Sequence, residues 1–330
     1  MTDTPDGEQM RADTRALADA AEKRGIPWVY LGNLHLRLGE GRHQRHLYRT
    51  YTDRTSHLGW VIARDKAHTN RVLREAGLPV PRQAVVTSLD EAIHAASEMD
   101  GPVVVKPRSA DNGVGITVGI TEPDQVATAF RKAIRHEEGV LVEQQIPGDD
   151  YRLFVVGDRT VAAARREAAH LVGDGVRSVT ELIAEVNLDP LRGEGKETPL
   201  RRLVQDDDSL GVLRVQGHAP DSVPDEGERV FLRTARNVSM GGTATDVTDL
   251  VHPDNRDLAV RATRTVGLDV AGVDFLTPDI ARSHRDAGGG VCEVNPTPGM
   301  RMHLWPSEGE PRDVAGAIID LLFPPDAPSP

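Results

Sequence analysis

The sequence predicts an α+β protein of two lobes, preceded by a short N-terminal lead-in lobe. Short strands and helices alternate at close spacing in the first lobe, a pattern typical of compact α+β structure. A Pro-Gly step then separates this run from a second one, in which two late strands carry acidic and amide side chains. The predicted domains are the lead-in lobe, a small lobe and a large lobe, at residues 1–61, 62–147 and 148–330.

The composition indicates a soluble globular protein. Its 330 residues are 38% hydrophobic and carry a formal net charge of −12, which disfavours nucleic acid because phosphate backbones require clustered Lys and Arg. No apolar run reaches the roughly 18–20 residues of a membrane span, and the N-terminus lacks a signal-peptide core. Cys292 is the only cysteine, which excludes an internal disulfide. We therefore expect a cytoplasmic protein with no nucleic-acid or membrane partner, and a homodimer stays open.

The elements of the lead-in and small lobes are predicted from apolar periodicity and from Gly and Pro. Gly25 and Pro27 end an N-terminal helix, and Gly77 closes the first helix of the small lobe. The predicted helices are residues 8–24, 65–76, 89–98 and 123–136. The predicted strands and short extended pieces are residues 28–31, 32–60, 84–87, 102–106, 116–120 and 140–144.

The large lobe begins with two strands joined through Gly157 and Asp158, a favourable hairpin turn. Residues 187–226 are polar and rich in Pro and Gly, which is typical of a lid or of disorder, and we expect a lid that orders when substrates bind. The predicted strands are residues 151–156, 160–166, 270–276 and one that ends at 295, and the predicted helices are 178–186, 256–266 and 313–322.

Two late strands carry oxygen side chains that suit a divalent metal. Side chains on a strand alternate between faces, so Glu293 and Asn295 share a face, and Pro296 ends the ladder because it has no N–H to donate. The neighbouring strand, 270–276, carries a lone acid, Asp274, in an apolar run. Mg²⁺ takes such oxygen ligands together with nucleotide phosphates. The alternative is that Asp274 caps a turn and Glu293 forms a structural ion pair.

Two of only five lysines lie where phosphate binding is expected. Lys106 ends an apolar strand before a loop whose Gly113 and Gly115 let the backbone approach a ligand, and successive N–H groups can form an anion-binding nest. Lys66 begins a helix, where the dipole favours an anion. An ordinary hairpin turn explains the loop about as well, and for Lys66 the spacing alone favours a solvated first-turn lysine over a phosphate ligand.

The segment that joins the two lobes is a candidate adenine and ribose site. Free backbone groups of a hinge strand at residues 140–144 can read an adenine through hydrogen bonds. Seven residues after Glu143, Asp150 can hold ribose hydroxyls. The alternative is that both acids are surface charges.

The order of these parts resembles that of the ATP-grasp ligases, including D-alanine–D-alanine ligase, whose end motif also has the form E-x-N-x-x-P-G-M. The closest branch is the ATP-grasp module of cyanophycin synthetase, although that family carries His and Arg at Asn112 and Val114. The resembling segments span roughly residues 45–324. They are TDRTS at 52–56, AARRE at 163–167, GDG at 173–175, RGEG at 192–195, LRTAR at 232–236, GGTATDVTD at 241–249, VHP at 251–253, GVD at 272–274, EVN at 293–295 and PGMRMH at 298–303.

The resemblance implies an ATP-grasp fold, ATP bound with two Mg²⁺ or Mn²⁺ ions, and small amino-acid substrates. The implied metal ligands are Asp274, Glu293 and Asn295. The implied nucleotide residues are Lys66, Lys106, Ser109, Asn112, Gly113, Gly115, Glu143, Gln144, Ile146 and Asp150. The implied catalytic residues are Lys106, Arg166, Arg233 and Arg301, and the implied substrate residues are Arg166, His170, Arg301 and His303.

The predicted activity is amide-bond formation between an amino-acid carboxylate and an amine through an acyl phosphate, giving ADP and phosphate. Because the resemblance does not extend into a Mur-ligase-like module, we expect a freestanding enzyme of dipeptide or modified amino-acid synthesis in specialised metabolism. Two alternatives stay open, a ligase that acts on a protein or peptide tail and a non-catalytic module that senses ATP. The three candidate metal ligands and both lysines disfavour the sensor, because nucleotide binding alone would tolerate their loss.

Overall fold

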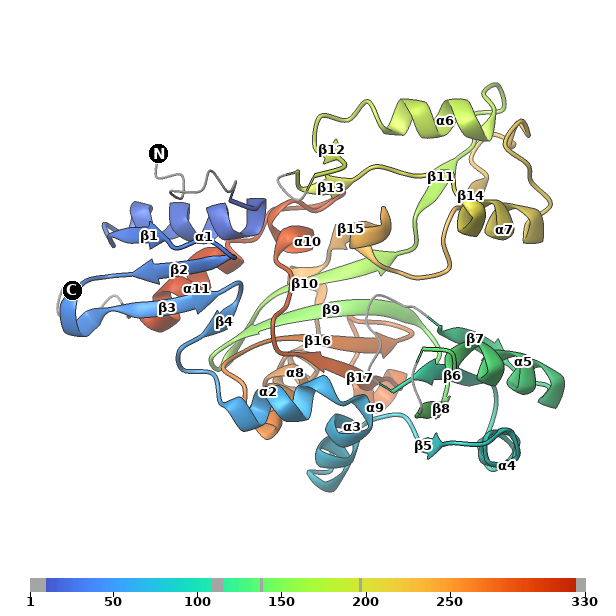
Figure 1. Cartoon of the computed structure of the whole chain (residues 1–330), viewed down its shortest axis with the longest axis horizontal. Coiled ribbons are helices and arrows are strands. Elements are labelled where there is room, and N and C mark those ends of the chain that lie inside the picture. Colours follow the sequence, from blue (N-terminus) through green and yellow to red (C-terminus); the bar gives the residue numbers. More distant parts are fainter. Residues whose placement is uncertain (1–9, 109–114, 137–138, 196–197, 325–330) are drawn as a thin grey trace. The chain divides into compact units, whose positions relative to one another are not determined.

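The structure, a computed structural model, describes residues 10–108, 115–136, 139–195 and 198–324 (Figure 1). The backbone groups into two compact units, each assembled from separated stretches of chain. Unit 1 contains Met1–Asp53, Ala164–Val247 and Gly299–Pro330, and unit 2 contains Arg54–Ala163 and Thr248–Pro298. The units describe compactness alone, so the division into three contiguous lobes stays a prediction.

The first sheet of unit 2 has four antiparallel strands in the order β5-β8-β6-β7. Helices α4 and α5 pack on it, and their apolar side chains share a core with Val103, Val105 and Val142 of the strands (Figure 1). Helix α5 begins with Pro123, whose fixed φ suits a first helical turn. The elements are β5 (Gln83–Val86), α4 (Leu89–Ser97), β6 (Val103–Pro107), β7 (Thr117–Ile120), α5 (Pro123–Ala133) and β8 (Val140–Gln144).

The second sheet of unit 2 contains the strands with the predicted metal ligands. Strand β16 lies between β9 and β17 and is antiparallel to both, and the first part of β10 extends the sheet beyond β9. Helix α8 packs against β9, β16 and β17 and ends at Gly267, which adopts the left-handed conformation common after helix ends. The elements are β9 (Asp149–Val156), β10 (Arg159–Glu167), the 3₁₀ helix η3 (Thr248–Leu250), α8 (Pro253–Val266), β16 (Val270–Thr277), α9 (His284–Ala287) and β17 (Gly290–Asn295).

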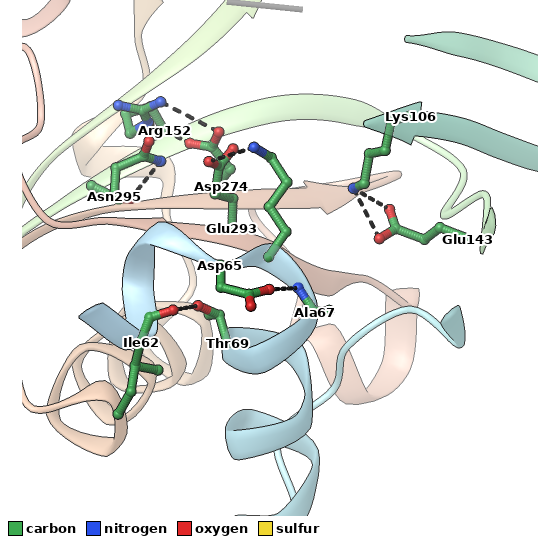
Figure 2. Close-up of polar contacts among 12 residues, drawn as sticks. Ile62, Asp65, Ala67, Thr69, Lys106, Glu143, Arg152, Asp274, Glu293 and Asn295 are labelled. Atoms are coloured by element: carbon green, nitrogen blue, oxygen red, sulfur yellow. Dashed lines mark hydrogen bonds and ion pairs between the residues drawn. The ribbon is translucent and has the colours of Figure 1, made fainter. Parts of the chain in front are cut away.

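Two consecutive helices, α2 and α3, lead into the first sheet of unit 2. Ser56 caps α2, and the carboxylate of Asp65 caps α3 by accepting from the N–H of Ala67 at 3.0 Å (Figure 2). The hydroxyl of Thr69 donates to the carbonyl of Ile62 at 2.8 Å and so ties α3 to α2. Their bounds are His57–Arg64 and Lys66–Glu75. The prediction of extended pieces over residues 32–60 was therefore wrong at its C-terminal end, because Ser56 caps a helix that begins at His57.

The N-terminal part of unit 1 is an antiparallel meander in the order β1-β2-β3-β4. Helix α1 contacts both this sheet and α11. The guanidinium of Arg24 donates to the carboxylate of Asp320 at 2.5 and 3.0 Å, which links the two helices. The elements are α1 (Ala12–Lys23), β1 (Trp28–Tyr30), β2 (His35–Leu38), the 3₁₀ helix η1 (Gly41–His43), β3 (Arg45–Tyr48), β4 (Tyr51–Thr52) and α11 (Val314–Leu322).

The rest of unit 1 is a set of short strand pairs and helices around a second apolar core. Strands β11 and β14 pair and share this core with α6 and α7 through Leu171, Leu182, Leu213 and Val230. The second part of β10 pairs with β15, and β12 with β13. The elements are β11 (His170–Val172), α6 (Val179–Val186), β12 (Arg192–Gly193), β13 (Leu200–Arg201), α7 (Asp207–Val215), β14 (Arg229–Phe231), η2 (Val238–Met240), β15 (Thr243–Asp246) and α10 (Arg301–Leu304).

The described part of segment 187–226, residues 187–195 and 198–226, contains more secondary structure than its composition predicts. Asp206 and Ser209 form a capping box that begins helix α7, and the apolar side of α7 is buried through Leu213. The acidic run at 206–208 is therefore a helix start, because acidic side chains favour the N-terminal end of the helix dipole.

Most other predicted elements are confirmed within a few residues at their ends, including the two strands that carry Asp274 and Glu293. Sequence reasoning did not identify β11, β14, β15 or α10, which are three or four residues long. In the described part of the chain, the helices are all too short or too polar to cross a bilayer.

Candidate active site

Four charged side chains form a row across unit 2. Arg152 on β9, Asp274 on β16 and Glu293 on β17 are direct partners in the strand register, so their side chains share one face of the sheet. Lys66, the first residue of α3, reaches Glu293 with its ammonium 3.5 Å from the Oε1 atom. Two carboxylates thus lie side by side with a cation at each end.

The carboxylates of this row are held by ion pairs. The guanidinium of Arg152 donates to Asp274 through Nε and through a second nitrogen at 3.3 Å (Figure 2). The two side chains are only 10% and 14% exposed, so the pair is largely shielded from water. Directly opposed like charges destabilise a sheet, and the flanking cations offset that repulsion between Asp274 and Glu293. Glu293 therefore forms an ion pair with Lys66, as the alternative interpretation of this residue predicted.

Asn295 completes the predicted metal set. Its amide nitrogen donates to the carbonyl of Gly272 at 3.2 Å, which directs the other side of the amide, the oxygen, away from the backbone (Figure 2). No three His, Cys, Asp or Glu side chains within the described ranges converge as a metal site. The set here has a different composition, two carboxylates and an amide, whose hard oxygens fit Mg²⁺ completed by phosphate and water.

Lys106 and Glu143 form a second buried ion pair in unit 2. They lie on the adjacent strands β6 and β8 with their charged groups 2.9 Å apart, and their side chains are 8% and 7% exposed (Figure 2). Burial alone would lower the pKa of Lys106, but the negative charge of Glu143 raises it, and that of Glu293 adds to the effect. Lys106 is therefore held as a cation.

Cys292 lies on β17 where the register with β16 shifts, between the pairs Asp274–Glu293 and Phe275–Val291. Burial raises the pKa of the Cys292 thiol well above its ordinary value, and the nearby carboxylate of Glu143 adds to the effect. The side chain is therefore a protonated thiol that fills space beside Lys106.

The predicted hinge differs from the expectation of free backbone groups. Strand β8 lies between β5 and β6, so its backbone is paired on both sides. The N–H groups of Gln144 and Gln145 also donate, at 2.8 and 2.9 Å, to the carbonyls of Arg82 and Pro102. The expectation of free backbone groups along residues 140–144 was therefore wrong, because this strand is paired on both sides.

Part of the predicted phosphate loop lies outside the described residues, namely Ser109, Asn112 and Gly113. Gly115 is described and has a φ of +74°, and a Cβ placed there would lie 2.9 Å from side-chain atoms of both His136 and Pro107. Glycine is thus required at this position by conformation and by space. Asp150, the predicted ribose acid, lies on β9 opposite Leu276.

The other predicted residues lie in unit 1. Arg166 is on β10, paired in register with Ala244. His170 begins β11, and its Nδ1 lies 2.9 Å from the carbonyl of Ala168, which requires Nδ1 to donate. Its Nε2 therefore accepts from Arg229 at 3.0 Å.

Arg233 is nearly buried and makes one ion pair, with the carboxylate of Asp206 at 2.6 Å. Its Nε atom is buried without a hydrogen-bond partner among the described residues. Since Asp206 also caps α7, this pair attaches the helix in segment 187–226 to Arg233, two residues after the end of β14.

Arg301 and His303 lie on α10. Burial lowers the pKa of the Arg301 guanidinium, Asp13 opposes that shift, and the positive charge of Arg201 adds to it. One nitrogen of Arg301 lies 3.5 Å from the carbonyl of Thr198. The His303 side chain is 2% exposed.

Comparison with known proteins agrees with this geometry. An ATP-grasp domain family matches residues 63–160, and a RimK-like ATP-grasp domain family matches residues 200–322. Both matches are to ATP-grasp domains, which confirms the predicted resemblance and the α+β ATP-grasp fold.

Its relatives include cyanophycin synthetases and bifunctional glutathione synthetases. The cyanophycin synthetase of a Nostoc species is 42% identical over 313 residues, which are 94% of this chain and 35% of the relative. The bifunctional protein GshAB of Pasteurella multocida is 35% identical over 326 residues, 96% of this chain and 43% of the relative. A crystal structure of the bifunctional glutathione synthetase from Pasteurella multocida aligns with a TM-score of 0.74, covering 96% of this chain and 44% of that one. The chain thus spans less than half the length of each.

Arg152 is the member of the charged row that sequence reasoning missed. It sits in the run Asp-Tyr-Arg-Leu-Phe, where a single arginine at a strand start carries no motif. Its importance comes from the register that places it opposite Asp274, and pairing between strands more than a hundred residues apart cannot be read from local pattern.

Proposed function

We propose that this chain is an ATP-dependent carboxylate–amine ligase that forms an amide bond between amino-acid substrates. The observation that carries the proposal is the juxtaposition in unit 2 of Asp274, Glu293 and Asn295 with the ammonium group of Lys66. The identities of 35–42% with cyanophycin and glutathione synthetases support the same reaction class.

In the proposed reaction a carboxylate oxygen attacks the γ-phosphorus of ATP, the bond to the β,γ-bridging oxygen breaks, and ADP leaves. An amine nitrogen then attacks the acyl carbon, inorganic phosphate leaves, and the amine gives up one proton. Both steps concentrate negative charge on phosphoryl oxygens, which cations held in place stabilise without reorganisation.

In this proposal Asp274, Glu293 and Asn295 hold two Mg²⁺ ions, for which Mn²⁺ can substitute. Bound there, the ions would neutralise the β- and γ-phosphates as the leaving group departs. The oxygen ligands and their position on one sheet face support the assignment.

The proposed nucleotide-binding residues of unit 2 include cations for the phosphates and a glycine that lets the backbone approach them. Lys66 and Lys106 are assigned to the phosphates, and Gly115 to the loop that approaches them. The remaining assignments, to adenine, ribose and the phosphate loop, are Glu143, Gln144, Ile146, Asp150, Ser109, Asn112 and Gly113. The pairing of Lys106 with Glu143 supports a shared role, since each fixes the rotamer of the other.

The proposed substrate residues lie in unit 1. Arg301 is assigned to a substrate carboxylate, because its guanidinium is partly desolvated beside the like charge of Arg201 and an anion would relieve both effects. Arg233 is assigned to the phosphoryl group or a substrate carboxylate, since its Nε lacks a partner in the described structure. Arg166, His170 and His303 are assigned to the same substrate by their place in the shared motifs.

The test is a screen of ADP release over pairs of amino acids, with mass detection of the product. The proposal expects ADP to appear only with a matching pair, together with a product lighter by one water than the sum of the two. A Glu293→Gln variant is the matched control and should release none. ADP release that requires a protein or peptide tail would favour the tail-modifying alternative, and tight ATP binding with no release under any pair would favour the sensor.

A further inference from the structure

The charged row of unit 2 is balanced without any metal ion. In this row Asp274 is paired with Arg152, and Glu293 is paired with Lys66. A divalent ion added to this row would give it a net positive charge unless a cation withdrew or a phosphate arrived. The row therefore provides metal ligands, and its two cations also oppose metal binding until phosphate is present.

The Arg152 side chain has a defined place beside Asp274. A Cβ built on Gly272 would lie 2.9 Å from Arg152 Cδ and 3.0 Å from its NH1 atom, so the glycine leaves the space that the arginine fills. Both guanidinium contacts go to the two oxygens of Asp274, the atoms that a metal ion would take. Arginine and metal therefore compete for one carboxylate.

We propose that Arg152 and Lys66 are built-in counter-ions that occupy the metal carboxylates until nucleotide brings its phosphates. This inference rests on the proposed function, because it assumes that Asp274 and Glu293 are metal ligands. Arg152 is a positioning residue here, acting through Asp274. Nucleotide and metal then bind cooperatively, since phosphate compensates the charge that the metal adds and favours release of the two cations.

The test measures Mn²⁺ binding from the electron paramagnetic resonance signal of free Mn²⁺, with and without a non-hydrolysable ATP analogue. The wild-type protein should bind Mn²⁺ weakly alone and far more tightly with the analogue. Arg152→Gln removes the competing cation, so it should tighten Mn²⁺ binding without nucleotide by roughly 5–150-fold, the usual range of such couplings. The gain from adding the analogue should shrink by the same factor.

Two further variants separate this role from a structural one. Lys66→Gln tests the other end of the row and should also tighten nucleotide-free Mn²⁺ binding. Arg159→Gln is the matched control, because Arg159 is an exposed arginine at the start of β10, and it should change nothing. A merely structural arginine would behave differently, since its loss would weaken Mn²⁺ binding under both conditions. If Arg152→Gln does not fold, Arg152→Lys and Lys66→Gln carry the test, because lysine cannot repeat the two-nitrogen contact.

The outcomes distinguish the inference from the function on which it rests. One outcome overturns the counter-ion inference alone. In that outcome Mn²⁺ binds normally with the analogue, but Arg152→Gln and Lys66→Gln leave nucleotide-free Mn²⁺ binding unchanged or weaken it. Absence of Mn²⁺ binding by the wild type even with the analogue overturns the metal site and the inference with it. Loss of all binding in Asp274→Asn, with tightening in the other two variants, is the expected result.

Discussion

Lys106 and Glu143 lie diagonally across strands β6 and β8 with their charged groups 2.9 Å apart, and each is more than nine-tenths buried. They occupy the face of the sheet opposite to the one that Val103 and Val105 bury under helices α4 and α5. A residue predicted to bind phosphate and one predicted to bind adenine are thus each other's counter-ion. Neither can be changed without affecting the other.

Removing Lys106 alone should therefore reduce both stability and nucleotide binding. Lys106→Met leaves Glu143 as a buried unpaired charge, which typically costs about 3–5 kcal/mol, measurable by urea unfolding. Lys106→Met/Glu143→Leu should recover most of that stability and still fail to bind ATP. ATP binding at wild-type strength by the double variant would contradict the assignment of these residues to the nucleotide.

The two lysines assigned to phosphate should affect turnover strongly. Lys66→Ala and Lys106→Ala should each lower ADP release by ~10²-fold or more, the scale expected for a lost charge-stabilising group. Lys23→Ala, an exposed lysine in the last turn of α1, is the matched control and should leave ADP release unchanged. Wild-type rates in both test variants would show that the site has been placed wrongly.

Arg301 should affect the amino-acid substrate and leave nucleotide binding intact. Loss of a charge-assisted contact to a carboxylate typically costs about 2–5 kcal/mol, so Arg301→Ala should raise KM for one amino acid by more than tenfold. The assay holds ATP at saturation and varies each amino acid in turn. A defect confined to ATP, or no defect, would mean that Arg301 only shapes the loop near Thr198.

Segment 187–226 should be protected from proteolysis when substrates are bound. Because helix α7 is capped at Asp206 and tied to Arg233, we expect cleavage of the apo protein before residue 206 and little cleavage within the helix. Nucleotide with amino acids should slow that cleavage, because a closed lid would keep water from the acyl phosphate. Equal cleavage with and without ligands would remove the lid role.

Acid should destabilise the protein partly through Asp65. The hydrogen bond from Arg108, helped by the backbone N–H groups of His68 and Ala67, holds the pKa of Asp65 below its ordinary value near 3.8. A lowered folded-state pKa means that the contribution is fully present above about pH 4 and is lost as pH falls through the folded-state value. Asp65→Asn should therefore show a flatter fall in unfolding free energy between pH 5 and pH 3, roughly the range over which such carboxylates titrate. An unchanged acid slope would show that Asp65 is not linked to folding.

Two glycines near the phosphate loop offer a matched comparison. Gly115 and Gly119 both have positive φ, +74° and +70°, but only at Gly115 would a Cβ meet other side chains. Gly119→Ala should cost about 1–2 kcal/mol for the left-handed backbone alone. Gly115→Ala should cost measurably more in thermal or urea unfolding, and equal losses would show that the contact with His136 and Pro107 relaxes easily.

Elements with long apolar periodicity and clear caps could be predicted from the sequence. Helices α5, α8 and α11 and strands β6, β8 and β16 were located this way, because each buries one face or stripe in a core. Helices α2 and α7 were missed for a physical reason, since a short helix depends on its cap, and Ser56 and Asp206 also suit a loop.

Some features of the candidate site could likewise be predicted from the sequence, and others could not. Asp274, Glu293 and Lys66 were recognised because residue type, strand alternation and a helix start are local properties. Arg152 and the Lys106–Glu143 pair depend on which strands are neighbours and in which register, and tertiary structure alone determines that. The burial of strand β8 between two partners likewise follows from sheet order.

The two lysines proposed to bind phosphate lie in Arg54–Ala163, and the two carboxylates proposed as metal ligands lie in Thr248–Pro298. The intervening Ala164–Val247 belongs to unit 1. Three of the residues assigned to substrate, Arg166, His170 and Arg233, fall in that intervening stretch. In the proposed assignment these three residues and the metal ligands lie in separate stretches of the chain, so residues 164–247 of a relative can be grafted without replacing any proposed metal ligand.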